Sequence, residues 1–273
     1  MPSAPKPRRP VRGKLPAPSV QDFRQRLDAA LNAKDDLGRK WSDAKWGCYA
    51  FYDYDGEPIY VGQTNEQLRV RVKRHLTNQR TDAVAMRILD VFEVAELELW
   101  PLWEFEGLTK KDEPVVHSEA KAALNAVEYN AYLQAIGASK FKAILNEKIP
   151  PVSQQVALPP SRRFELISDE NRRERGHPDI RIARRAETLS RLAAVAHERG
   201  EVSDGLRRVL VIQAVRLAYL SATRYAEAEG RPEPDPASID VHGLVGSVML
   251  ERSDPAADMD EVSGEGDADS TLS

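Results

Sequence analysis

Apolar positions near the start of the chain follow first a helical and then a strand period. Phe23, Leu27 and Leu31 recur every fourth residue, which predicts a helix from about 19 to 32 with Ser19 as its cap. From Trp46 the pattern is typical of strands, and the polar, glycine-containing stretch 53–58 predicts a turn between two of them. The second strand is expected at 59–61.

Further elements follow at short intervals. Leu68, Val72 and Leu76 share one helix face, so we expect a helix over 67–77. The next predicted elements are a helix at 81–90, an alternating strand at 94–102, a helix at 118–135 closed by Gly137, and a helix or turn at 141–145. These elements predict an α+β fold.

Beyond residue 150 the pattern becomes helical. Two segments, 180–199 and 203–229, flank Gly200 and predict a helical hairpin, and a short helix is expected at 241–250. The predicted organisation is a basic, proline-rich disordered arm (1–18), an N-terminal helix and link (19–45), a compact α+β domain (46–150), a proline-containing linker (151–161), a helical extension (162–250) and a disordered acidic tail (251–273).

Composition narrows the class of protein. The chain has 273 residues and a net charge of -4, with no apolar run of the ~20 residues that cross a bilayer and no secretory signal core. We therefore expect a cytoplasmic protein without a membrane partner. Cys48 is the only cysteine, which excludes an internal disulfide and a zinc site of several thiolates, and we expect it to be a buried strand residue.

Charge is distributed unevenly. The first twenty residues carry five basic groups and no acid, while 254–273 carry seven acids and no base. The arm could touch phosphates or be a solvated tail, and the acidic tail could contact a basic partner or restrain DNA binding. The arginines between 162 and 191 favour internal ion pairs, with a DNA surface as the alternative. The apolar helix near 203–229 packs in the core or forms a homodimer.

A set of polar side chains suits phosphodiester hydrolysis. Tyr49 and Tyr60 lie on the two predicted hairpin strands, and Arg71 and His75, four residues apart, share a helix face. Glu128 falls in an apolar run, where a lone carboxylate is costly without a cation. An arginine fork matches phosphate oxygens, a carboxylate can hold Mg²⁺, and a phenol beside cations can have its pKa lowered.

The order of these residues resembles the GIY-YIG nuclease family. The resemblance rests on Gly47-Cys48-Tyr49, Tyr60-Val61-Gly62, Arg71 with His75, Glu128 and Asn146, and covers about residues 46–150. It implies a small three-stranded antiparallel sheet flanked by helices. It also implies an endonuclease that hydrolyses DNA by a one-metal mechanism and leaves a 5′-phosphate.

The resemblance also implies a role for each residue. Tyr49 would be the base or water-orienting phenol, with Tyr60 its partner; Arg71 would stabilise transition-state charge, and His75 would assist proton movement or bind phosphate. Glu128 would hold Mg²⁺, with Mn²⁺ as an alternative, and Asn146 would fix the local geometry.

Other positions qualify this assignment. Gly47 and Gly62 are expected to let the backbone approach a ligand. Arg69, Lys73 and Arg74 are candidate phosphate contacts, Glu119 is a rival of Glu128, and Cys48 stands where an aliphatic residue is usual. The alternative function is a non-cleaving module that binds DNA or recruits a partner on the same fold.

Overall fold

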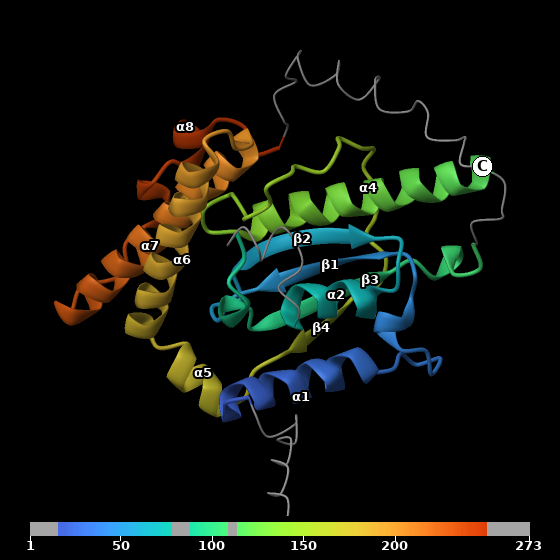
Figure 1. Ribbon diagram of the computed structural model, residues 1–273, viewed down its shortest axis with the longest axis horizontal. Helices are drawn as coiled ribbons and strands as arrows, with labels where there is room; N and C mark the ends of the chain where they lie inside the picture. The colour runs from blue at the N-terminus through green and yellow to red at the C-terminus, as the bar shows by residue number, and fades with distance from the viewer. Residues whose placement is uncertain (1–15, 78–87, 109–113, 250–273) are drawn as a thin grey trace, which may run out of the picture.

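The computed structural model describes residues 16–77, 88–108 and 114–249 (Figure 1). Four antiparallel strands form a sheet in the order β2-β1-β3-β4. Their bounds are Gly47–Tyr52 for β1, Pro58–Thr64 for β2, Glu96–Pro101 for β3 and Arg162–Glu165 for β4. The predicted α+β class is confirmed, and the sheet has four strands where three were expected.

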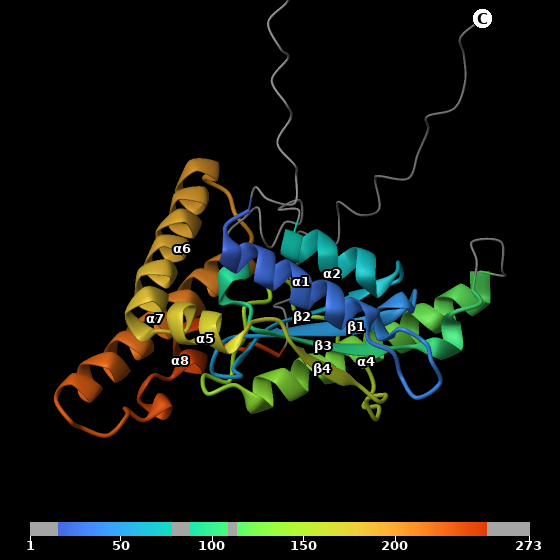
Figure 2. The same cartoon turned by 90° about the horizontal axis from the view of Figure 1, so that it is seen from below.

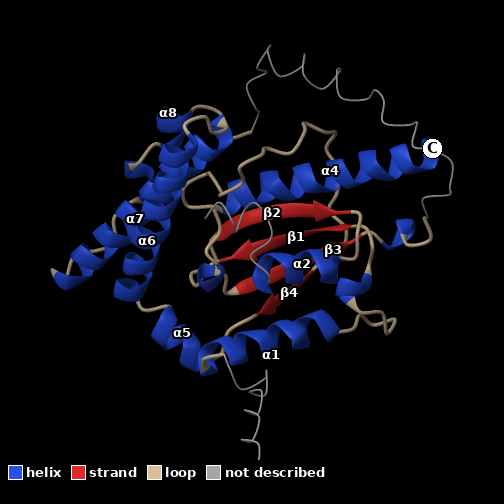
Figure 3. Ribbon diagram, viewed as in Figure 1, coloured by secondary structure: helices blue, strands red, loops and turns tan. Residues whose placement is uncertain are grey.

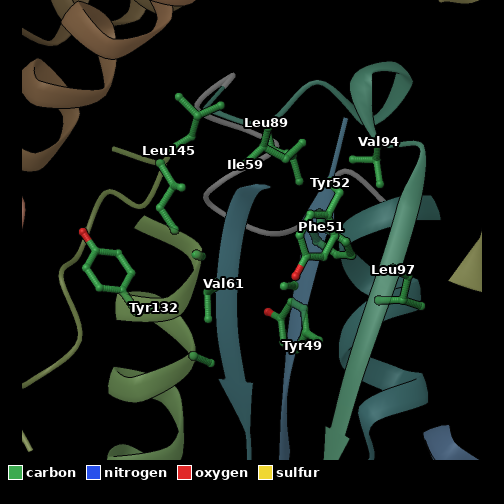
Figure 4. Packing of buried hydrophobic residues seen from close by; sticks show 14 of the residues in the cluster. Tyr49, Phe51, Tyr52, Ile59, Val61, Leu89, Val94, Leu97, Tyr132 and Leu145 are labelled. Atoms are coloured by element: carbon green, nitrogen blue, oxygen red, sulfur yellow. The ribbon is translucent and has the colours of Figure 1, made fainter. Parts of the chain in front are cut away.

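Helices cover both faces of the sheet (Figures 2 and 3). α1 (Pro18–Asn32) and α2 (Leu68–Thr77) lie on one side, and α4 (Pro114–Ala138) lies on the other, against β2. All six residues of β1 are buried because both faces are covered and both edges are paired. Figure 4 shows Val61 of β2 pointing toward α4, which carries Tyr132.

The hairpin turn between β1 and β2 is built on Asp53. Its backbone carbonyl accepts a hydrogen bond from Gly56, and its side-chain Oδ1 accepts bonds from the backbone N–H groups of Asp55 and Glu57. Gly56 has φ +71°, a conformation that favours glycine. The predicted turn at 53–58 is therefore confirmed.

Connecting segments differ more from the sequence-based predictions. The predicted helix at 81–90 lies mostly outside the described residues, which resume before the short 3₁₀ helix η3 (Val91–Glu93). For residues 141–145, where a helix or a turn was expected, the structure shows a turn that leads into extended chain. Short 3₁₀ helices lie at Trp41–Asp43 (η2), Trp103–Phe105 (η4) and Pro236–Ser238 (η5), and α5 (Asp169–Arg175) was not predicted.

The helical hairpin consists of α6 (Pro178–Arg199) and α7 (Asp204–Ala228), followed by α8 (Val241–Val245). It stands beside the turn end of the β1–β2 hairpin (Figure 1). Most arginines of the 162–191 stretch form ion pairs within the chain, as the favoured interpretation predicted: Arg163, Arg172, Arg181, Arg184, Arg185 and Arg191. No helix in the described ranges is long and apolar enough to cross a membrane.

A buried charge hub joins the hairpin turn to these helices. We use this name for Asp53, Glu93, Arg181, Arg185 and Arg216. Asp53 Oδ2 accepts hydrogen bonds from the three arginines at 3.1, 2.9 and 2.8 Å, in that order. Burial alone would raise the pKa of Asp53, but the guanidinium groups, Arg216 foremost, hold it below its ordinary value.

Candidate active site

The sheet register places the two phenols on one face. Tyr49 pairs with Gly62 and Phe51 with Tyr60, and the strand period of two directs Tyr49, Phe51 and Tyr60 to the same side. The ring centroids of Tyr49 and Tyr60 lie 6.3 Å apart. That side faces α2, whose contacts complete the arrangement.

His75 of α2 meets the Tyr49 phenol directly. The Tyr49 hydroxyl lies 2.7 Å from His75 Nε2, and the His75 ring centroid lies 5.6 Å from that of Tyr60. Burial, aided by the charges of Arg71 and Arg74, lowers the pKa of His75 to about 3. The imidazole is therefore neutral near pH 7, so the tautomer with Nε2 unprotonated can accept a hydrogen bond from the phenol, while the buried Nδ1 has no hydrogen-bond partner in the described structure.

Arg71 brings a positive charge to the same face, one helical turn before His75. Its charge opposes the effect of burial on the pKa of the Tyr49 phenol. Its Nε is buried and has no partner among the described residues. Arg71 therefore keeps donor capacity for an anionic ligand.

Both phenols are weaker acids than the sequence suggested. Burial raises the pKa of Tyr49 well above its ordinary value and that of Tyr60 to about 12, against the opposing charge of Arg71. The expectation of a lowered phenol pKa is therefore wrong for the protein without ligand, because desolvation outweighs the one nearby cation.

Glu128 lies on α4 beside the outer edge of β2. Its carboxylate is influenced by the adjacent Gln63, and only 8% of the residue is exposed. Burial raises its pKa to about 7, although Lys121 and Arg71 oppose the shift. Although α4 covers the opposite face of the sheet, the charge of Glu128 raises the pKa values of Tyr49 and Tyr60. We call these five residues the site cluster: Tyr49, Tyr60, Arg71, His75 and Glu128.

Asn146 supports the edge strand rather than the reacting face. Its Oδ1 accepts from the Val61 backbone N–H at 3.0 Å, and its Nδ2 donates to the Val61 carbonyl at 2.7 Å. The neighbouring Leu145 N–H donates to the carbonyl of Ile59 at 2.8 Å. Loop 145–146 thus pairs with β2 where no further strand exists, and it fixes the backbone between Tyr60 and Gly62.

The two motif glycines make room for protein atoms, and the expected approach to a ligand stays a prediction. A Cβ on Gly62 would lie 2.5 Å from the hydroxyl oxygen of Tyr49, and one on Gly47 would lie 2.6 Å from the carbonyl oxygen of Trp100. Gly62 is therefore needed because the Tyr49 phenol lies directly over it.

The other candidates are distributed as follows. Glu119 is exposed, whereas Glu128 is buried in the site cluster. Arg69 binds the carbonyl of Leu31 and the side chains of Asn32 and Asp43; Lys73 pairs with Asp28, and Arg74 with Glu66. Cys48 is buried as predicted.

Gln63 is a site residue that the sequence reasoning missed. Its Nε2 donates to Asn125 Oδ1 at 3.0 Å, and its buried Oε1 has no partner among the described residues. The available signal was its position directly after Tyr60-Val61-Gly62, on the strand that Glu128 borders.

The comparisons with known proteins identify one domain. Residues 45–112 match the family model described as the GIY-YIG catalytic domain. The match includes Tyr49, Tyr60, Arg71 and His75 and ends before Glu128 and Asn146. Neither a curated protein nor a solved structure matches the chain.

Proposed function

We propose that this chain, whose residues 45–112 match the GIY-YIG catalytic domain, is a divalent-metal-dependent endonuclease that hydrolyses DNA and leaves a 5′-phosphate. The observation that carries the proposal is the site cluster itself. It combines a hydrogen-bonded Tyr49–His75 pair, an arginine with an unused buried donor and one buried carboxylate. Buried groups with shifted pKa values and incomplete partners are typical of functional sites.

The donor set fits a hard cation that keeps most of its water ligands. Among the described residues no group of three or more His, Cys, Asp or Glu side chains could hold a metal. Glu128 offers one buried carboxylate, and the neighbouring Gln63 Oε1 is an oxygen without a partner. Mg²⁺ is commonly held by one or two carboxylates and water, and Mn²⁺ accepts similar ligands. When bound, such a cation supplies positive charge at the phosphate and leaving-group oxygens.

Arg71 binds the phosphodiester in this scheme. Its guanidinium stays charged at any working pH and can direct donors, the free Nε among them, at phosphate oxygens. Its charge acts on the Tyr49 phenol, so a phosphate bound to Arg71 would lie near that hydroxyl. Negative charge develops on the phosphate oxygens during hydrolysis, and the Arg71 guanidinium beside them stabilises it.

Tyr49 and His75 orient and deprotonate the water. The Tyr49 hydroxyl donates to His75 Nε2, which leaves the phenol oxygen free to accept a hydrogen bond from a water molecule. The phosphate offsets the Arg71 charge, which is one cause of the low His75 pKa. His75 is therefore a better proton acceptor with substrate bound than without it.

Plasmid cleavage tests the proposal. We expect the wild-type protein to nick or cut supercoiled DNA with Mg²⁺ or Mn²⁺, and Arg71→Ala and Glu128→Gln each to lose at least a hundredfold in rate. Glu119→Gln, an exposed glutamate on the same helix, is the matched control and should cut normally. Circular dichroism verifies that each variant is folded.

The outcome also separates the alternative function. If the wild-type protein retains DNA in a gel shift but cuts no DNA form with either metal, the chain is a binding module and the endonuclease proposal is wrong. If Glu128→Gln cuts DNA as well as Glu119→Gln does, Glu128 is not the metal ligand.

A further inference from the structure

Arg74 and Glu66 form a two-pronged ion pair next to the site cluster. Arg74 Nη1 donates to Glu66 Oε1 at 2.9 Å, and Nη2 donates to Oε2 at 2.7 Å. The Arg74 side chain is 33% exposed and that of Glu66 is 44% exposed. The pair is therefore accessible to a ligand from solvent.

The position of Arg74 on α2 ties this pair to the site cluster. Arg74 lies three residues after Arg71 and directly before His75, so Arg71 and Arg74 are neighbours on the helix surface. Its charge contributes to the low pKa of His75, and Glu66 acts on the pKa of Arg71. Both partners thus lie within electrostatic range of the groups that would receive the phosphodiester.

Glu66 is held in place by the end of the motif strand. Its backbone N–H donates to the hydroxyl of the buried Thr64 at 3.0 Å, two residues after Gly62. This local hydrogen bond fixes the chain between β2 and α2, so the carboxylate meets Arg74 at a defined place.

The other cations of α2 are less suited to an exchange of partners. Arg69 is held by three groups at the end of α1 and in η2, which makes it a structural contact. Lys73 is a single-point donor paired with Asp28 of α1. Arg74 alone on this helix presents a guanidinium fork to a single exposed carboxylate in the described structure.

We propose that Arg74 is a contact for a DNA backbone phosphate, and that Glu66 occupies its guanidinium fork until DNA replaces the carboxylate. The inference rests on the proposed function. A phosphodiester offers two oxygens to the same pair of N–H donors, so the exchange conserves both hydrogen bonds. Glu66 also repels phosphate, and DNA that binds here must displace it. The pair therefore weakens binding of any duplex that cannot make the remaining contacts.

Binding of a short fluorescent DNA duplex, followed by anisotropy without divalent metal, tests the inference. We expect Glu66→Gln to bind about 3- to 10-fold more tightly than wild type and Arg74→Gln to bind about 3- to 10-fold more weakly. Arg74→Gln should also lower the slope of log K against log salt by about 0.9, the value for one lost phosphate contact. In the double variant, Glu66→Gln should bring no gain, because its effect acts through Arg74.

Glu187→Gln is the matched control, since it removes the same charge from an exposed glutamate–arginine pair on α6. The inference is overturned if Glu66→Gln tightens binding no more than Glu187→Gln does, or if its gain persists without Arg74. Plasmid cleavage by the same wild-type preparation separates the two proposals. If the wild-type protein cuts plasmid DNA but the binding data give either overturning result, only the exchange of Glu66 for phosphate is refuted. If the wild-type protein neither binds nor cuts DNA, the exchange and the endonuclease proposal are both refuted.

Discussion

Two groups of buried polar side chains lie along the same β-hairpin, and they differ in how far their charges are matched. At the turn, Asp53 receives three arginines within 3.1 Å, and Glu93 pairs with Arg185 at 3.0 Å. A few hub atoms lack a hydrogen bond, among them Arg181 Nε, but every hub residue is paired through other atoms.

The site cluster shows the opposite pattern. No ion pair within the described residues reaches Arg71 or Glu128; Glu128 is buried, and Arg71 is half-buried with its Nε out of contact with water. The carboxylate of Glu128 is left with a pKa of about 7, and Arg71 Nε and His75 Nδ1 have no partners in the described structure. The comparison shows that the hub charges are matched by partners within the chain, whereas the charges of the site cluster are not, a difference that is typical of functional sites.

The largest expected effect comes from removing the central acid of the hub. Asp53→Asn leaves three buried guanidinium groups without their shared carboxylate, so the free energy of unfolding should fall by about 3–5 kcal/mol. Urea denaturation measures the loss. Asp179→Asn, which breaks an exposed pair with Arg224, should leave the urea midpoint unchanged. Equal midpoints for the two variants would show that the hub does not stabilise the fold.

A second prediction uses pH, to which the unmatched groups of the site cluster should respond. His75 has a folded pKa of about 3 against an ordinary 6.5, so the unfolded chain binds more protons between these values and stability rises with pH there. Glu128 has a folded pKa of about 7 against 4.5, so the folded chain binds more protons and stability falls as pH rises through that window. Between pH 4.5 and 6.5 the two contributions oppose each other.

Single variants, measured in the absence of metal, should therefore reveal the separate contribution of His75 and of Glu128 to the change of stability with pH. Relative to wild type, Glu128→Gln should gain about 1.4 kcal/mol of stability per pH unit as pH rises from 4.5 to 6.5, and His75→Gln should lose a similar amount. Urea midpoints across this range provide the measurement. Parallel pH profiles for all three proteins would mean that neither group is shifted as described.

The smallest expected effects on stability concern Gly62, which lies beneath the Tyr49 phenol. Gly62→Ala places a Cβ against the Tyr49 ring, and we expect a loss of about 1–3 kcal/mol together with a displaced Tyr49–His75 contact. Gly137→Ala meets nothing within 4 Å on α4 and should be neutral or stabilise the protein by up to about 1 kcal/mol. A thermal or urea melt compares them, and a Gly62→Ala protein as stable as wild type would show that the phenol can move aside.

The sequence predicted the elements whose pattern is local. The β1–β2 hairpin, α2 and α4 follow from the spacing of apolar residues, and the Tyr49, Tyr60, Arg71 and His75 positions follow from motif order. β4 was missed because three of its four residues are exposed and only Phe164 is half-buried, so no alternation marks it. The roles assigned to the site residues remain predictions.

Contacts between residues far apart in the chain, and the depth at which side chains are buried, could not be predicted from the sequence for a physical reason. The three hub arginines were visible as residues, but nothing local indicates that they converge on Asp53. The direction of the phenol pKa shifts also depends on burial depth, which the order of residues does not reveal. Gln63 was missed because its importance comes from its neighbour across the strand edge, Glu128.

The hub has a consequence for how the chain is made. Asp53 precedes its arginine partners by 128 to 163 residues, and the last of them, Arg216, leaves the ribosome long after the β1–β2 hairpin. Until then the turn carries an acid that must stay in water or remain only partly compensated. A nascent chain therefore completes the hub late, and a shortened gene product that stops before α7 would hold the site cluster without Arg216, the last partner of Asp53.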